Sequence, residues 1–306
     1  MSLDQARDRE QRVALEILKP VGQSTQFVTG TWASMTDIWA HRELISLLVK
    51  RELKSRYKDS SLGIVWSLIR PLAQLLIYYF AIGQILGVAR SIPSFAIFVF
   101  VGLTAWGLFV EIIQGSTTSI TNNSGLIKKI YLPREIFPLA SVGGALFNFG
   151  VQLIILIFAT IVAGQIPWDL NLLYAPLSLG VLILFATGLG ILLAGLNVYM
   201  RDIQHLVEVA TIVLFWASPI VYSFAFVHEK LQGNWLEQLY LSNPITLAVL
   251  GMQRAFWVAG TTESTSQNWP LDLDTRLWIA LGVSLVLIWL GQRVFSRIQG
   301  NFAQEL

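Results

Sequence analysis

Residues 122–140 read NNSGLIKKIYLPREIFPLA and separate two long apolar runs. The stretch carries two Pro and four charged residues, Lys128, Lys129, Arg134 and Glu135, in a chain of which only 13% is charged. Positive charge collects in any short cytoplasmic loop, because it fixes the orientation of a membrane protein. Charge alone favours that explanation. Apolar residues are interleaved with the charges, however, and a solvated loop does not need them, so we expect another protein to bind this loop.

The composition places the chain among integral membrane proteins. Hydrophobic residues make up 54% of 306 residues, and the mean hydropathy is +0.60. A net charge of +2, with basic residues at the edges of apolar runs, indicates no nucleic-acid partner. The chain has no Cys, and its three His residues are far apart in the sequence, so we expect no disulfide and no metal site.

Six apolar segments are long enough to cross a hydrocarbon core of about 30 Å as helices. We therefore predict an all-α integral membrane protein with six transmembrane helices, at residues 61–86, 95–114, 139–162, 172–199, 206–226 and 276–295. The even number and the placement of the basic residues predict that both termini are cytoplasmic. The polar residues 1–35 show no signal-peptide pattern, and we interpret them as a cytoplasmic N-terminal extension.

The segments outside the spans divide into two kinds. Residues 36–58 predict an amphipathic interface helix before the transmembrane domain of residues 59–306. Its Lys50, Arg51, Lys54 and Arg56 are expected to guide lipid phosphates, unless the helix is only an anchor. Between the fifth and sixth spans, residues 235–240 and 244–258 predict short helices that lie on the outer face or are partly re-entrant.

The first span contains polar groups at membrane depth. Arg70 and Gln74 fall near one helix face, where polar side chains normally meet protein or water. Arg70 could instead extend to the cytoplasmic headgroups, and the sequence leaves both alternatives open. Pro71 is expected to bend this helix.

Nothing in the sequence provides an energy source. There is no P-loop, no H-E-x-x-H, no G-x-S-x-G, and no evident inverted repeat of a secondary transporter. The chain is therefore not expected to be an enzyme, and six spans of this kind fit half of a larger pore that a separate subunit drives.

Five ordered motifs resemble the ABC-2 membrane subunits that export lipid-linked polysaccharides and teichoic acids. The first is [KR]-Y-x-x-S-x-L-G-x-x-W-x-x-x-x-P at residues 56–71, and the others are LIKKIYLP at 126–133, YMRDI at 199–203, SPIVY at 218–222 and NP at 243–244. The resemblance runs from about residue 37 to the end. It implies a homodimer of six-span subunits, each docked on a nucleotide-binding ABC ATPase that holds ATP and Mg, while this chain binds no cofactor.

The resemblance also implies where the functional residues lie. The loop after the second span would couple to the ATPase through Lys128, Lys129, Tyr131, Arg134 and Glu135, with a smaller contact at Arg201 and Asp202. Short outer gate helices would follow the fifth span. The first and fifth spans would line the channel, and their candidate residues are Trp66, Arg70, Gln74, Tyr78, Tyr79, Phe80, Phe215, Trp216 and Tyr222.

The mixture of aromatic and polar residues in these two spans suits an amphiphilic sugar chain, whose ring faces stack on aromatic planes and whose edges meet amides or hydroxyls. Each aromatic alone fits lipid-facing filler, and only their coincidence in two spans favours a channel. We therefore predict a polysaccharide-export permease of a bacterial cytoplasmic membrane. The alternatives are an ABC-2 exporter of a drug or small lipid, a membrane scaffold and a proton-coupled carrier.

Overall fold

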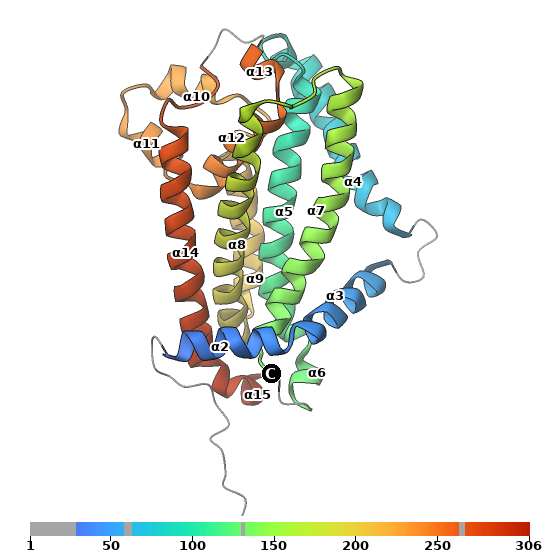
Figure 1. The fold of residues 1–306 in the computed structure, drawn as a ribbon, viewed down its shortest axis with the longest axis vertical. Helices are drawn as coiled ribbons and strands as arrows, with labels where there is room; N and C mark the ends of the chain where they lie inside the picture. The colour runs from blue at the N-terminus through green and yellow to red at the C-terminus, as the bar shows by residue number, and fades with distance from the viewer. Residues whose placement is uncertain (1–28, 58–62, 130–131, 263–266) are drawn as a thin grey trace, which may run out of the picture.

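The computed structural model describes residues 29–57, 63–129, 132–262 and 267–306. This part of the chain is helical and contains no strand. Figure 1 shows a bundle of long helices with short helices at both ends. Five helical segments are long and apolar enough to cross a membrane, at Trp66–Ile85, Phe95–Asn122, Ile136–Val162, Leu170–Tyr199 and Leu273–Asn301. The expected all-α membrane fold is confirmed, with one long helix fewer than predicted.

The central helix of the bundle is α5 (Phe95–Asn122), which packs against α7 (Ile136–Val162), α8 (Tyr174–Tyr199) and α12 (Pro244–Phe256). Apolar side chains cover α5 on nearly every side, so it can be surrounded by other helices without exposing polar groups. In its most apolar window, 78% of the residues are buried inside the protein.

The helices α8 and α14 (Leu273–Ile298) form the most extensive helix pair. A Cβ atom at Gly291 would lie 2.3 Å from the carbonyl oxygen of Gly188, and one at Gly188 would lie 2.6 Å from the backbone nitrogen of Ile288. Only glycine allows the two backbones to approach so closely. Gly188 of α8 therefore serves close packing against one specific partner, which is α14.

The first span stands at the side of the bundle, as Figure 1 shows for α4 (Trp66–Tyr78). None of the α4 residues is buried. After Tyr78 the helix widens into a π-helical segment, η2 (Tyr79–Ile85), and then reaches the short η3 (Val88–Arg90). Gly83 of η2 lies against the ring of Phe95, where a Cβ atom would be 2.7 Å from the nearest ring carbon.

The expected continuous helix over residues 206–226 is not observed. The helix α9 (Asp202–Trp216) ends ten residues earlier, and residues 217–223 form an irregular buried segment before α10 (Phe224–Leu231). The side-chain amide of Gln253 donates a hydrogen bond of 2.6 Å to the Pro219 carbonyl, and the Thr246 hydroxyl donates one of 3.2 Å to the Ala217 carbonyl. Because α12 satisfies these carbonyls, a non-helical backbone can lie inside the protein.

The segment between α9 and α14 forms short helices, as expected. They are α10, α11 (Trp235–Leu241), α12 and α13 (Ala259–Thr262). The Asn243 side chain caps α12 by accepting a 3.0 Å hydrogen bond from the Ile245 amide, and Pro244 follows at the first helical position. Eleven residues of α12 are buried, so this helix inserts among α5, α8 and α14.

The opposite end of the bundle carries α2 (Thr29–Ala40), α3 (Arg42–Tyr57), α6 (Ser124–Ile127), η5 (Gln299–Asn301) and α15 (Phe302–Glu305) (Figure 1). The predicted interface helix is thus divided at His41, and α3 lies against α7, where a Cβ atom at Gly143 would meet Val49 at 2.6 Å. The short 3₁₀ helices η1 (Gly63–Val65) and η4 (Leu170–Leu173) precede α4 and α8. We call the end that carries α6 the α6 end, and we call the end that carries α10, α11 and α13 the α10 end.

Candidate transport site

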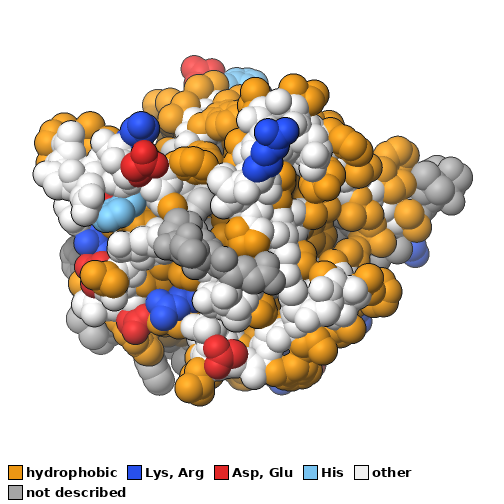
Figure 2. Space-filling view, turned by 90° about the horizontal axis from the view of Figure 1, so that it is seen from above, with side chains coloured by type: hydrophobic (Ala, Val, Ile, Leu, Met, Phe, Trp, Pro, Cys, Tyr) orange, Lys and Arg blue, Asp and Glu red, His pale blue; other side chains and the backbone are white. Residues whose placement is uncertain are grey.

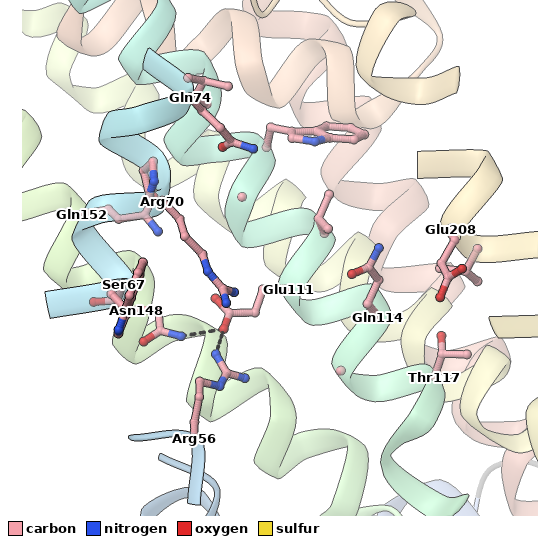
Figure 3. Close-up of a pocket in the computed structure, with 18 of the residues that line it drawn as sticks. Arg56, Ser67, Arg70, Gln74, Glu111, Gln114, Thr117, Asn148, Gln152 and Glu208 are labelled. Carbon is pink, nitrogen blue, oxygen red and sulfur yellow. Dashed lines mark hydrogen bonds and ion pairs between the residues drawn. The ribbon is translucent and has the colours of Figure 1, made fainter. Parts of the chain in front are cut away.

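A cavity of about 830 Å³ opens between α4, α5, α7 and α9, and Arg56 of α3 reaches it from the α6 end (Figure 3). Both polar and apolar side chains line it. Three of the predicted channel residues, Trp66, Arg70 and Gln74, are among them. Other residues that line the cavity are Arg56, Ser67, Trp106, Glu111, Gln114, Asn148, Gln152 and Glu208.

A hydrogen-bonded charge network forms one wall of the cavity. The guanidinium of Arg56 makes an ion pair with Glu111, and the amide of Asn148 donates a 2.5 Å hydrogen bond to the same carboxylate oxygen (Figure 3). A second nitrogen of Arg56 lies 3.6 Å from the Glu52 carboxylate. Burial raises the pKa of Glu52, although the nearby Arg56 acts in the opposite direction. The network therefore joins α3, α5 and α7 through the shared carboxylate of Glu111.

Arg70 lies on the cavity side of α4. Its side chain extends from α4 toward Glu111 in Figure 3, and Gln74 lies one turn further along the same wall. Of the two open alternatives for Arg70, this geometry corresponds to lining the cavity. Glu52 and Glu111 engage the guanidinium of Arg56, one of the groups that were expected to guide lipid phosphates.

The other basic residues of α3 divide in the same way. All four basic residues are exposed, but Arg51 donates a hydrogen bond to the Asn123 side chain, between α5 and α6, as Arg56 does to Glu111. Exposed ammonium groups are available to an anionic surface, and engaged guanidinium groups are held by the protein.

The aromatic residues of the first and fifth predicted spans meet above the cavity. Tyr78 stacks on Phe215 with ring centroids 5.6 Å apart, and the edge of Trp106 contacts Phe215 at the same centroid distance. The Tyr222 hydroxyl donates a 2.7 Å hydrogen bond to the Trp216 carbonyl. The structure thus brings α4, α5 and α9 together through rings, as the coincidence of aromatic residues in two spans indicates.

Two predicted channel aromatics lie elsewhere. Tyr79 points toward Phe95, at a centroid distance of 6.5 Å, and Phe80 is exposed on the outer side of η2. Neither residue lines the cavity. Their place in the helix accounts for this result, since successive residues point in different directions around a helix axis.

Sequence reasoning missed several lining residues. Glu111, Asn148 and Gln152 belong to α5 and α7, which were not proposed as channel helices. A usable signal was present, because Asn148 and Gln152 are polar, lie four residues apart and therefore share one face of an otherwise apolar helix. Glu111 is a second signal, being a carboxylate within a spanning helix.

The predicted coupling loop lies at the α6 end. Lys128 and Lys129 are exposed directly after α6, while Ile127 is buried. Tyr131 lies outside the described residues. Arg134 is partly buried, with its guanidinium carbon 5.5 Å above the ring of Phe302. Arg201 and Asp202 are exposed at the start of α9.

Glu135 requires a correction. It was grouped with the residues that contact the ATPase, but its side chain has 0% exposure and faces α14. The sequence places it among Lys and Arg residues in a loop, and this neighbourhood gave no indication that the chain turns inward there.

These features define a multi-pass membrane protein with a polar, partly aromatic cavity on one side of its bundle, which is the arrangement of a transport subunit. The family model for the ABC-2 type transporter matches residues 43–257, so the chain belongs to that family.

Curated relatives cover most of the chain. It is 28% identical over 271 residues to an O-antigen export system permease protein of Myxococcus xanthus, covering 88% of this chain and 98% of that protein. A protein of the same description from Klebsiella pneumoniae is 27% identical, covering 86% and 95%. The polysialic acid transport protein KpsM of Escherichia coli is 24% identical, covering 79% and 91%.

Proposed function

We propose that the chain is the transmembrane permease subunit of an ATP-driven exporter that moves a lipid-linked polysaccharide across the bacterial cytoplasmic membrane. The relatives named as O-antigen and polysialic acid permeases support the substrate class. O-antigen, teichoic acid and cell-wall galactan chains all have the required chemistry. The cavity supports the proposal most directly, because amides and charges line it together with Trp66 and Trp106. Trp106 also contacts the stacked rings of Tyr78 and Phe215 beside the cavity.

In this proposal the energy comes from a partner. A nucleotide-binding ABC ATPase would hold ATP and Mg and dock at the α6 end through Lys128, Lys129, Tyr131 and Arg134, with Arg201 and Asp202 beside them. Two permeases and two ATPases would form the complex. The exposed apolar side chains of α4 and α9 support a permease homodimer, since they include Leu76, Ile77, Leu206, Val209 and Trp216.

The proposed topology has six crossings and cytoplasmic termini. The fifth crossing would consist of α9 and the irregular residues 217–223, and α10 to α12 would serve as gate helices at the outer face. Seen from above, the surface at the α10 end shows a few Lys or Arg side chains among apolar and neutral ones, and some of them lie next to Asp or Glu (Figure 2). The exposed Lys50, Lys54, Lys128 and Lys129 lie toward the α6 end, which supports a cytoplasmic position for it.

Docking is tested with charge reversal. We expect Lys128→Glu/Lys129→Glu to abolish co-purification of the ATPase and export together, since both ammonium groups are exposed and a docking cleft of opposite charge would repel the new carboxylates. Lys230→Glu is the matched control, because Lys230 is exposed in α10 at the far end of the bundle. Normal assembly of the double variant would contradict the docking proposal.

The substrate class is tested in vesicles that contain the permease and its ATPase. We expect a lipid-linked glycan to stimulate ATP hydrolysis, and the same lipid without the glycan to stimulate it less. Stimulation by amphipathic drugs or short lipids instead would favour the alternative, an ABC-2 exporter of a drug or small lipid.

A further inference from the structure

The completely buried carboxyl group of Glu135 lies at the base of the loop that we assign to ATPase docking. It directly precedes α7 and faces the end of α14, and the side-chain amide of Gln299 in η5, directly after α14, donates a 3.3 Å hydrogen bond to it. The carboxyl group also interacts with Gln292 of α14 through a hydrogen bond, and with the charges of Arg293 of α14 and Asp37 of α2. Burial raises its pKa. An acid in such a position is costly for folding, so a purely structural role would be served as well by an apolar residue.

Arg134 fastens the same part of the loop to the C-terminal segment. Its guanidinium lies over the ring of Phe302, which has 0% exposure. The Phe302 ring in turn packs edge to face against the rings of Phe295 and Tyr199, with ring centroids 5.4 and 6.0 Å apart. The Tyr199 hydroxyl donates a 2.8 Å hydrogen bond to the Ile298 carbonyl. The base of the loop, the end of α14, α15 and the end of α8 therefore form one connected group, which we call the C-terminal clamp.

The clamp is continuous with the most tightly packed helix pair. Beyond Arg293, the backbones of α14 and α8 touch at Gly291 and Gly188, and α12 packs against both helices. Packed helices of this kind transmit displacement as a unit, because their interfaces do not deform continuously.

We propose that Arg134 and Glu135 are positioning residues that fasten the docking loop to α14 and α15, so that a displacement of the loop by the ATPase moves α14 and α8 together with it. This inference rests on the proposed function. It assigns to the end of α14 and to α15 a part in coupling, in addition to the loop.

The first test replaces the buried acid in the complete complex of permease and ATPase. We expect Glu135→Gln to assemble and to hydrolyse ATP within about twofold of wild type, while export falls at least about fivefold, so that more ATP is hydrolysed for each chain exported. Glu135→Asp should recover part of the export. Glu305→Gln is the matched control, since Glu305 is an exposed acid of α15 in the same segment.

The second test remains informative if Glu135→Gln does not fold. In a chain without native Cys, Arg134→Cys/Phe302→Cys can be joined by a short bifunctional thiol reagent. We expect export to persist after crosslinking, at the level of the same variant without reagent, because the two segments move together. A block of export on crosslinking, or an unchanged ratio of ATP to export in Glu135→Gln, would overturn the inference. Failure of the proposed function itself is distinguishable, because the wild-type complex would then show neither glycan export nor glycan-stimulated hydrolysis.

Discussion

The side of the bundle formed by α4 and α9 and the core formed by α5, α8 and α14 are both built mainly from apolar residues, yet they are buried very differently. In the most apolar window of the first span 6% of the residues are buried, compared with 78% in α5. The core excludes solvent and lipid through close backbone contact at glycines. The α4 and α9 side instead combines exposed apolar residues with a polar cavity. We therefore expect the core to be rigid, and the α4 and α9 side to bind substrate in its cavity.

The largest effect is expected in the core. Gly291→Leu would place a side chain against the Gly188 carbonyl, and a backbone atom cannot move aside as a flexible side chain can. Overpacking usually costs about 1–3 kcal/mol, and we expect the upper part of that range. Thermal unfolding in detergent should show a melting temperature lowered by several degrees.

Gly282→Leu is the control for this prediction, since a Cβ atom at the exposed Gly282 of the same helix meets nothing within 4 Å. Equal stability of both variants would contradict the assignment of rigidity to the α8 and α14 contact.

The charge network at the edge of the cavity should show the next largest effect. Glu111→Gln removes the carboxylate that Arg56 and Asn148 share, and we expect export to fall about tenfold, with a loss of about 1–3 kcal/mol of stability. Arg56→Gln/Glu111→Gln should lose less than the sum of the two single variants, because both singles break the same pair. Additive losses in unfolding and export assays would show that the pair is not a functional unit.

Water access distinguishes the cavity from the lipid-facing surface. We expect a Cys that replaces Gln74 to react with a membrane-impermeant thiol reagent during ATP turnover, since Gln74 lines the cavity. Ile154→Cys and Leu285→Cys should stay unlabelled, because these residues are 69% and 51% exposed on apolar surfaces of α7 and α14, which we expect lipid to cover. Tyr222→Cys should react less than Gln74→Cys, because Tyr222 is partly buried. Labelling of Ile154→Cys as fast as Gln74→Cys would remove the distinction.

The smallest effect concerns the pH dependence of stability at the C-terminal clamp. Because burial raises the pKa of Glu135 above its ordinary value of 4.5, the folded protein keeps this proton to a higher pH than the unfolded chain does. The associated stability is present below the ordinary pKa and is lost as the pH rises through the raised one. Glu135→Gln should flatten unfolding curves measured over this range, and Glu305→Gln should not. An unchanged slope in Glu135→Gln would indicate that the carboxyl group titrates normally.

Much of the architecture could be predicted because membrane helices are encoded locally. A run of about 20 apolar residues identifies its own helix, and Asn243 before Pro244 identifies the start of α12. The fifth span was predicted as one helix because its hydropathy is continuous through Phe226. The helix can end at Trp216 because Gln253 and Thr246, about 30 residues later in the chain, donate hydrogen bonds to the carbonyls that follow it. Such distant partners cannot be recognised from the local sequence pattern.

The candidate site was predictable only in part for the same reason. Arg70 and Gln74 stand out as polar residues in an apolar helix, and the structure places both at the cavity. That Arg56 is engaged by Glu111, 55 residues away, and that Tyr78 stacks on Phe215, could not follow from periodicity, since neither contact lies within one element.

The sequence by itself determined that this protein lies in a membrane, where its apolar segments are, and that it belongs to the ABC-2 family. Hydropathy and ordered motifs are properties of the chain alone. The tertiary structure decided which helices are surrounded and which stand at the side. It also decided that Glu135 is buried while Lys128 and Lys129 remain exposed. The physical reason is that burial depends on which surfaces meet across the bundle, and a residue's neighbours in space are set by the packing of helices that are distant in sequence.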